Sequence, residues 1–63
     1  MRNALIKFRG DRTQKEMGDR YGVNQQTWSQ WELGNVTPTA NKMIKIARDA
    51  GTTVDELFFA EEY

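Results

Sequence analysis

TQKEMGDRYGVNQQTWSQWELG, the stretch from Thr13 to Gly34, decides the fold of this 63-residue chain. Thr13 and Glu16, three residues apart, have the spacing of a capping box, in which a hydroxyl and a carboxylate satisfy the first amide groups of a helix. Asn24 is a favourable N-cap for a second helix, and Gly22 allows the backbone to turn between the two. We therefore expect two short helices joined by a tight turn.

The apolar residues of this stretch are spaced so that the two helices can pack together. Gly18 is small where the helices approach each other, and the two tryptophans supply large anchors on one side of the second helix. The full set of packing positions is Met17, Gly18, Tyr21, Val23, Trp28 and Trp31. Two helices packed across a tight turn form the framework of a helix-turn-helix, here at about residues 14–33.

The other side of the second helix is neutral and rich in hydrogen-bonding groups. At about 100° per residue, one arc of about 140° holds Gln25, Gln26, Ser29, Gln30 and Leu33. The amide of glutamine offers a donor and an acceptor together, which matches the N6 and N7 edge of adenine in the major groove. We therefore predict that Gln25, Gln26 and Gln30, and with them Ser29, contact DNA bases. The alternative is a solvated polar face, but such faces more often carry Glu and Lys.

Two further helices flank this pair. The first runs from about Arg2 to Arg9 and ends at Gly10. The other begins after Thr39 as its N-cap and closes at Gly51. No alternation of apolar and polar residues is long enough for a strand, so we predict a single all-α domain over residues 1–63.

The C-terminal segment repeats the capping-box spacing at Thr53 and Glu56 and predicts a last short helix. Its aromatic residues, Phe58, Phe59 and Tyr63, are expected to be half core and half interface, with Phe59 the more exposed. An acidic and aromatic segment of this kind could also meet a protein partner, which leaves a protein-interaction module such as an antitoxin or adaptor as an alternative function.

Composition narrows the function classes. The chain has no Cys and no His, so we expect no metal, no disulfide and no cofactor, and with no Gly-rich phosphate loop we expect no enzyme. The formal net charge is zero, but Lys and Arg predominate before residue 32 and Asp and Glu after it, which suits one end of the chain to phosphate. No signal-like or membrane-spanning run is present, and a cytoplasmic protein without a small-molecule ligand is expected.

The Thr13–Gly34 stretch resembles the Cro/C1-type (XRE-like) helix-turn-helix family of phage and bacterial repressors. The likeness extends to Pro38, Ile46, Ala47, Gly51 and the closing Val54-Asp55-Glu56-Leu57, so it covers nearly the whole chain. The resemblance implies a compact five-helix bundle of the lambda-repressor-like type. It also implies paired glutamines opening the helix that enters the DNA groove.

The resemblance implies further roles outside the glutamine face. Gln14 matches a position that usually holds a DNA phosphate, and Arg9 and Glu32 match an ion pair that fixes the third helix against the first. Further phosphate candidates lie at helix starts, in the loop after the third helix and among nearby cations. The full set of candidates is Gln14, Asn24, Asn35, Thr37, Arg12 and Lys15.

Three departures from the family pattern stand out. The connection Gly10-Asp11-Arg12 is shorter than usual, so the match before Thr13 is less secure. Gly18 replaces the usual Ala and is expected to pack as closely at a cost of about 1 kcal/mol in helix propensity. Leu33 replaces a polar or basic residue, so we expect a phosphate contact to be lost there.

These patterns together predict a sequence-specific transcriptional regulator, more often a repressor in this family, that places the third helix in the major groove of an operator. A module this small contacts few bases, so we expect a homodimer on DNA. A competing hypothesis makes Trp28 and Trp31 stacking platforms for single-stranded nucleic acid, which would require both indoles to be exposed.

Overall fold

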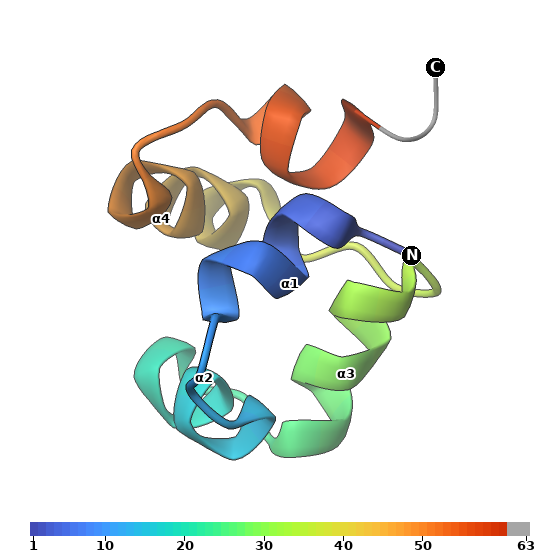
Figure 1. Cartoon of the computed structure of the whole chain (residues 1–63), viewed down its shortest axis with the longest axis vertical. Helices are drawn as coiled ribbons and strands as arrows, with labels where there is room; N and C mark the ends of the chain where they lie inside the picture. Colours follow the sequence, from blue (N-terminus) through green and yellow to red (C-terminus); the bar gives the residue numbers. More distant parts are fainter. Residues whose placement is uncertain (61–63) are drawn as a thin grey trace.

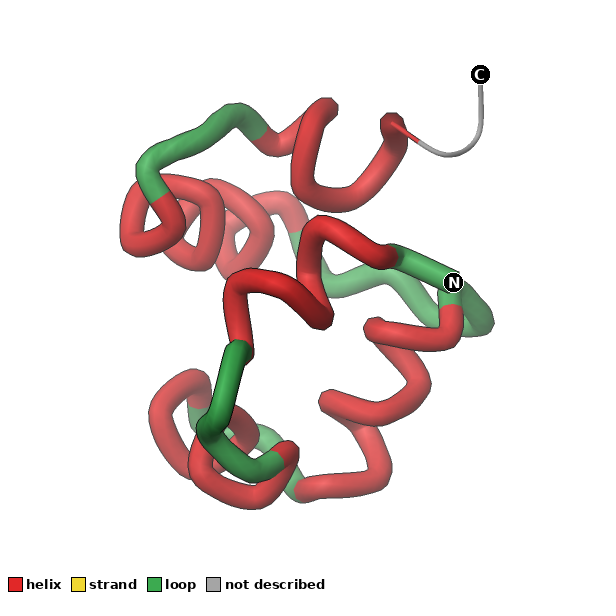
Figure 2. The backbone as a smooth tube through the Cα atoms, viewed as in Figure 1, coloured by secondary structure: helices red, strands yellow, loops and turns green. Residues whose placement is uncertain are grey.

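The structure, a computed structural model, describes residues 1–60 and contains five helical segments close to the predicted boundaries. In chain order they are α1 (Asn3–Arg9), α2 (Gln14–Tyr21), α3 (Gln25–Leu33), α4 (Ala40–Ala50) and η1 (Asp55–Phe59), a single wide turn of π-helix. Residues 1–60 contain no strand, so the all-α prediction is confirmed. Figure 1 shows α1 between the α2–α3 pair and the α4–η1 pair, and Figure 2 shows how short loops connect the helices.

Side-chain caps fix where the helices of the central pair begin. Thr13 Oγ1 accepts a hydrogen bond from the backbone N–H of Glu16 at 3.0 Å, and Glu16 Oε1 accepts one from the backbone N–H of Thr13 at 3.5 Å. Asn24 Oδ1 accepts from the backbone N–H of Thr27 at 2.7 Å. Each cap satisfies an amide that the first turn of a helix leaves without a partner, so the predicted starts of α2 and α3 are confirmed.

Two predictions at the chain ends need correction. Arg2 stands at the N-cap position and does not belong to α1, because its backbone, with φ −86° and ψ 83°, is not helical. At η1, Thr53 Oγ1 accepts from the backbone N–H of Glu56 at 3.1 Å, but the Glu56 carboxylate accepts from the hydroxyl of Thr52 at 2.6 Å. The second capping box is therefore only half formed, because a neighbouring hydroxyl competes for the carboxylate.

The core gathers apolar residues from every segment. Its centre is aromatic: the rings of Tyr21 and Trp28 stack at 5.8 Å between centroids and 11° between planes, and Trp31 meets Trp28 at 5.6 Å and 60°. The buried apolar residues are Leu5, Met17, Tyr21, Trp28, Trp31, Ile46, Ala47, Leu57 and Phe58. Aromatic rings in offset or tilted pairs bury large apolar areas, which gives this small domain a core without disulfides or metal.

The approach of α2 to α3 is closer at Gly18 than an alanine would allow. A Cβ atom placed on Gly18 would lie 2.6 Å from the carbonyl oxygen of Val23 and 3.1 Å from that of Asn24. The same turn is closed by a hydrogen bond from the backbone N–H of Val23 to the carbonyl of Gly18 at 2.8 Å. The expectation that Gly18 and Ala pack equally closely is therefore wrong for this chain, since the missing Cβ is what admits the backbone of the turn.

Candidate nucleic-acid interface

The two sides of α3 have opposite environments. Trp28 is fully buried and Trp31 is 3% exposed, whereas Gln25 and Gln26 are exposed. The third glutamine of the set is half-buried, as is Ser29. Because both indoles lie in the core, they cannot serve as stacking platforms for single-stranded nucleic acid, and that hypothesis is wrong.

Gln30 is held by the loop that follows α3. Asn35 Nδ2 donates to Gln30 Oε1 at 2.9 Å, and the backbone N–H of Asn35 donates to the carbonyl of Gln30 at 3.1 Å. The carboxamide oxygen is thus engaged, and the amino group of Gln30 is the end without a partner among residues 1–60. Gln25 and Gln26, by contrast, have both ends of the amide open to solvent.

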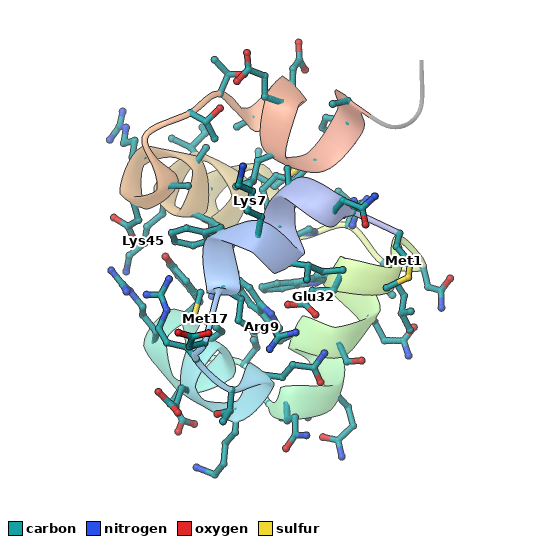
Figure 3. The ribbon with its side chains drawn as sticks, in the orientation of Figure 1. Met1, Lys7, Arg9, Met17, Glu32 and Lys45 are labelled. Atoms are coloured by element: carbon teal, nitrogen blue, oxygen red, sulfur yellow. The ribbon has the colours of Figure 1, made fainter. Side chains whose placement is uncertain are left out.

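Glu32 ties α3 to the rest of the bundle. Its carboxylate accepts from Arg9 Nε at 2.7 Å, from Gln14 Nε2 at 2.9 Å and from Trp28 Nε1 at 2.6 Å. Burial acts to raise the pKa of Glu32, but the hydrogen bonds from Arg9, Gln14 and Trp28 outweigh it and hold the pKa below its ordinary value. Figure 3 shows Arg9 and Glu32 pointing toward each other from α1 and α3. The ion pair implied by the family resemblance is present despite the short connection after α1.

Several residues expected to meet phosphate are already engaged inside the chain. The Gln14 amide is directed to Glu32, and Arg12 donates to the carbonyls of Phe8 at 2.6 Å and Arg9 at 3.1 Å. The Arg12 guanidinium also lies 5.1 Å from the centre of the Phe8 ring. Arg12 therefore closes the C-terminal end of α1, which explains how the short connection to α2 is stabilised.

The remaining phosphate candidates lie at the surface. Lys15 pairs with Asp19 at 3.0 Å, both largely exposed, and Asn24 uses its side-chain oxygen as the cap of α3. Thr37 is exposed in the loop after α3, where its hydroxyl accepts from Arg2 Nη2 at 2.8 Å.

Arg2 is the residue that the sequence analysis missed. It is 5% exposed, and its guanidinium donates to the carbonyls of Phe58 at 3.0 Å, Trp31 at 2.9 Å and Val36 at 2.8 Å. These bonds fasten the loop after α3 to the end of α3 and to η1. No spacing rule reveals such a role, because these backbone carbonyls and the Thr37 hydroxyl are distant from Arg2 in sequence.

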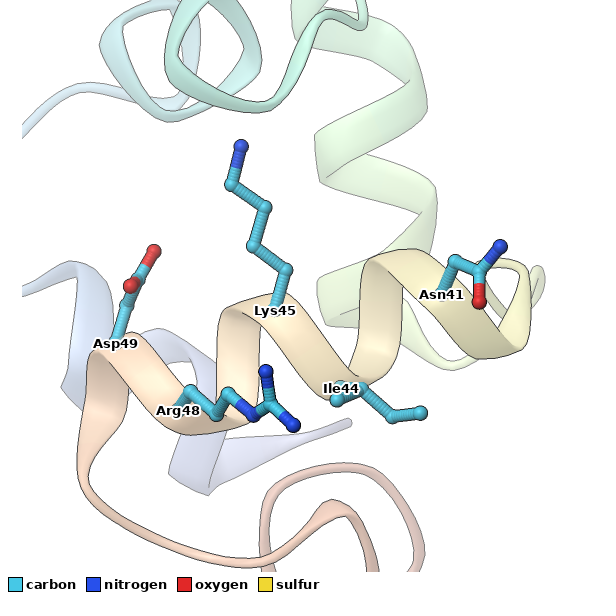
Figure 4. Close-up of a pocket in the computed structure, with 5 residues that line it drawn as sticks. All are labelled: Asn41, Ile44, Lys45, Arg48 and Asp49. Atoms are coloured by element: carbon cyan, nitrogen blue, oxygen red, sulfur yellow. The ribbon is translucent and has the colours of Figure 1, made fainter.

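The outer surface of α4 forms a separate, open hollow of about 470 Å³, shown in Figure 4. Lys45 reaches from it toward α2, where its Nζ lies 5.9 Å from the centre of the Tyr21 ring. Asp49 accepts from the Tyr21 hydroxyl at 2.8 Å, and Lys42 Nζ donates to the Tyr21 carbonyl at 2.7 Å. Burial, and then the hydrogen bond to Asp49, raise the pKa of Tyr21 to about 12. This surface therefore secures α2 against α4.

Of the C-terminal aromatic residues, Phe58 and Phe59 divide as predicted, with Phe59 the more exposed. Phe58 is fully in the core, and Phe59 is half-buried against it, while Tyr63 lies outside the described residues.

Within residues 1–60, no group of acidic side chains could hold a metal ion, and no helix is long and apolar enough to cross a membrane.

Comparisons with known proteins give one finding. The family model described as Helix-turn-helix matches residues 4–57, from α1 to η1. Comparisons with curated proteins and with solved structures give no match.

Proposed function

This chain belongs to the Cro/C1-type helix-turn-helix family of DNA-binding regulators, and from that premise we propose that it represses transcription by binding an operator with the exposed face of α3. In this proposal residues 1–63 form one DNA-binding domain that acts in the cytoplasm. The observation that carries the proposal is the division of α3, since its buried tryptophans leave Gln25 and Gln26 at the surface.

The proposed base contacts come from successive turns of α3. Gln25 and Gln26 form its first turn, the end that enters the major groove in helix-turn-helix complexes. Each amide can donate and accept toward one adenine. Gln30, one turn deeper, presents its amino group as a donor because Asn35 occupies its oxygen. Ser29 lies between them and is small enough to let the helix approach the base edges.

The proposed phosphate contacts surround this face. The free amides at the start of α2 are suited to one phosphate, with Gln14 and Lys15 beside them. Lys15 can exchange its exposed partner for a phosphate at little cost, because a surface ion pair contributes less than about 1 kcal/mol. The other contacts that we propose come from Asn24, Asn35, Thr37 and Arg12, with Arg12 the weakest because α1 takes its donors.

We propose that the operator is palindromic and is bound by two copies of the chain. One α3 helix contacts only a few base pairs, and a zero net charge limits the number of phosphates neutralised, so a single copy binds weakly. Two linked half-sites restore affinity without any change in the base contacts.

Selection of bound duplexes from a random pool tests the proposal and identifies the operator. With the selected duplex, Gln26→Ala is expected to weaken binding by about 1 to 3 kcal/mol and to relax discrimination at one base pair of each half-site. Asn41→Ala, which removes an exposed amide from α4, is the matched control and is expected to bind like the wild-type chain.

The salt dependence of the same titrations separates base contacts from phosphate contacts. Lys15→Ala is expected to lower the slope of log affinity against log salt by about one, whereas Gln26→Ala leaves that slope unchanged. Failure to enrich any duplex, or equal affinity of the Gln26→Ala variant for the selected site, would contradict the proposed function.

A further inference from the structure

Three large apolar side chains are exposed at one corner of the molecule, at the C-terminal end of α3. Met1 is 67% exposed, Leu33 is 43% exposed and Val36 is 47% exposed. The other large apolar side chain exposed to this degree among the described residues is Ile44, 42% exposed on the outer surface of α4. We call Met1, Leu33 and Val36 the apolar corner.

Two hydrogen bonds of Arg2 bring the backbones of these three residues close together. The backbone N–H of Arg2 donates to the carbonyl of Glu32 at 2.7 Å, which brings Met1 next to Leu33. The Arg2 guanidinium then donates to the carbonyl of Val36 at 2.8 Å. Figure 3 shows Met1 at this end of α3, and Figure 1 shows the N-terminus beside the loop that follows it.

The apolar corner is held in a fixed shape before any partner arrives. The backbone N–H groups of Gly34, Asn35 and Val36 all donate to the carbonyl of Gln30, at 3.1, 3.1 and 3.4 Å. Arg2, whose guanidinium is buried, holds the loop from the inside. A preformed apolar surface loses little conformational entropy when it is covered.

The chain residues around the corner favour contact with an identical surface. Gly34, Asn35 and Thr37 flank it and carry no charged side chain, so the α-amino group of Met1, a residue 67% exposed, is the charge that a two-fold contact must leave in solvent. Ile44, in contrast, lies beside Lys45, Arg48 and Asp49, where a two-fold contact would have to remove charged side chains from water. Exposed apolar side chains that meet across a two-fold axis remove each other from water.

We propose that Met1, Leu33 and Val36 form the contact between two copies of this chain bound to adjacent half-sites. This inference rests on the proposed function and adds the surface through which the copies meet. Leu33 lies on the same arc of α3 as the glutamines, at the opposite end of the helix from Gln25 and Gln26. The corner is therefore continuous with the proposed DNA face.

The small size of the corner determines when the contact forms. Stable complexes bury about 1,200 Å² or more, which three side chains from each copy do not reach, so the apolar corner by itself does not hold two copies together in solution. Half-sites one helical turn apart are centred about 34 Å from each other, and the Cα trace measures 28 × 23 × 21 Å. Neighbouring copies on DNA therefore meet only at their edges, and the contact appears as cooperative binding.

Paired half-site and full-site titrations test this inference. Leu33→Ala and Val36→Gln are expected to bind a duplex with one half-site within about twofold of the wild-type chain, since neither residue supplies a proposed base or phosphate contact and the alanine adds no group that could make one. On the palindromic duplex, each is expected to reduce cooperativity by about tenfold, because each removes one apolar side chain per copy. Ile44→Gln is the matched control, because Ile44 is similarly exposed. It is expected to change neither the affinity for the half-site duplex nor the affinity for the palindromic duplex.

Cross-linking locates the contact directly, because the natural chain has no cysteine. Val36→Cys is expected to form a disulfide-linked dimer on the palindromic duplex and not on the half-site, whereas Ile44→Cys forms none on either. Full cooperativity in both Leu33→Ala and Val36→Gln, or cross-linking through residue 44 in place of 36, overturns the inference while leaving half-site binding intact. A wild-type chain that binds no duplex overturns the proposed function and this inference with it.

Discussion

Arg9 on α1 donates to Glu32 on α3 at 2.7 Å, and the acidic member of this ion pair is only 3% exposed. The same carboxylate also receives Gln14 from α2 and the indole N–H of Trp28. One buried side chain thus connects the first three helices. The hydrogen bonds of this carboxylate fix the angle between α3 and the first two helices, and therefore the direction in which the glutamines of α3 point. The charge of Glu32 has all of these partners only in the folded state.

The first prediction concerns that carboxylate. Glu32→Gln is expected to lower the free energy of unfolding by about 3 kcal/mol, because an amide carries no charge for Arg9 and turns an N–H group toward other donors. Urea denaturation followed by tryptophan fluorescence measures the change. Asp19→Asn, which breaks the exposed pair with Lys15, is the control and is expected to cost less than about 1 kcal/mol.

Acid titration of stability distinguishes this role of Glu32 from packing alone. Because the folded pKa of Glu32 lies below its unfolded value, its contribution is complete above the ordinary carboxyl pKa of about 4.3 and is lost as pH falls through the folded pKa. The difference between the wild-type chain and Glu32→Gln should therefore shrink in acid. A constant difference from neutral to acid pH would show that the charge of Glu32 contributes nothing.

The second prediction concerns alkaline pH and Tyr21. Its pKa is raised to about 12 in the folded chain, by burial first and then by the hydrogen bond to Asp49. A raised pKa means that the folded state holds the proton more tightly, so stability is complete below the unfolded pKa of about 10 and declines as pH rises toward the folded value. Tyr21→Phe is expected to lose about 1 kcal/mol at neutral pH, the contribution of a typical hydrogen bond, and to lack this alkaline decline.

Denaturation midpoints of both proteins between neutral and alkaline pH test the assignment. All other groups are the same in the two chains, so their contributions cancel in the difference. The stability advantage of the wild-type chain should narrow above about pH 10. If the midpoints of the two proteins change in parallel over the whole pH range, the hydroxyl of Tyr21 is hydrogen-bonded to solvent and not to Asp49.

The sequence predicted the local features well because their causes are local. Thr13 and Asn24 act as N-caps through atoms only three residues away, and the spacing of Trp28 and Trp31 alone places them on the buried side of α3. Helix starts and apolar faces depend on nearest neighbours and helical period, so a single sequence carries them.

The missed features depend on partners distant in sequence. The sequence places Arg2 in the first helix and in the basic half of the chain, yet its guanidinium is buried and donates to a carbonyl 56 residues away. The phosphate contact of Gln14 stays a prediction, but nothing in the sequence indicates that its amide also donates to Glu32 on another helix. Donors with long side chains reach whichever acceptor the tertiary fold supplies, and no periodicity in the sequence encodes that choice.

The third prediction follows from the close approach at Gly18. Gly18→Ala gains about 1 kcal/mol of helix propensity, but its Cβ would lie 2.6 Å from the Val23 carbonyl oxygen, a backbone atom that must move. Because overpacking of this kind costs about 1 to 3 kcal/mol, we expect a net loss of stability. Thermal unfolding measures it.

Gly34→Ala separates this clash from the cost of backbone conformation. Gly34 has a φ of +86° with nothing within 4 Å of an added Cβ. Its replacement is therefore expected to cost only the energy of holding an alanine in the left-handed region, which is about 1 to 2 kcal/mol. The two variants should also differ in shape, since only Gly18→Ala shifts α3 against α2. If Gly18→Ala is more stable than the wild-type chain, the backbone of the turn at Val23 moves away from the added Cβ without a cost in stability.

The fourth prediction joins the loop to base selection. Asn35 Nδ2 donates to Gln30 Oε1 at 2.9 Å, so in the proposed complex the Gln30 amide presents its amino group, a donor suited to N7 or O6 of guanine and O4 of thymine. In Asn35→Ala the amide can rotate and accept from adenine or cytosine instead. We therefore expect weaker discrimination at the base pair proposed for Gln30, by about 1 kcal/mol, with little change at the pairs proposed for Gln25 and Gln26.

Binding of the variant to a set of duplexes that vary one base pair at a time measures this loss of discrimination. Because Asn35 is also a proposed phosphate contact, loss of that role alone would weaken every duplex equally; only a change confined to one pair assigns it the orientation of Gln30.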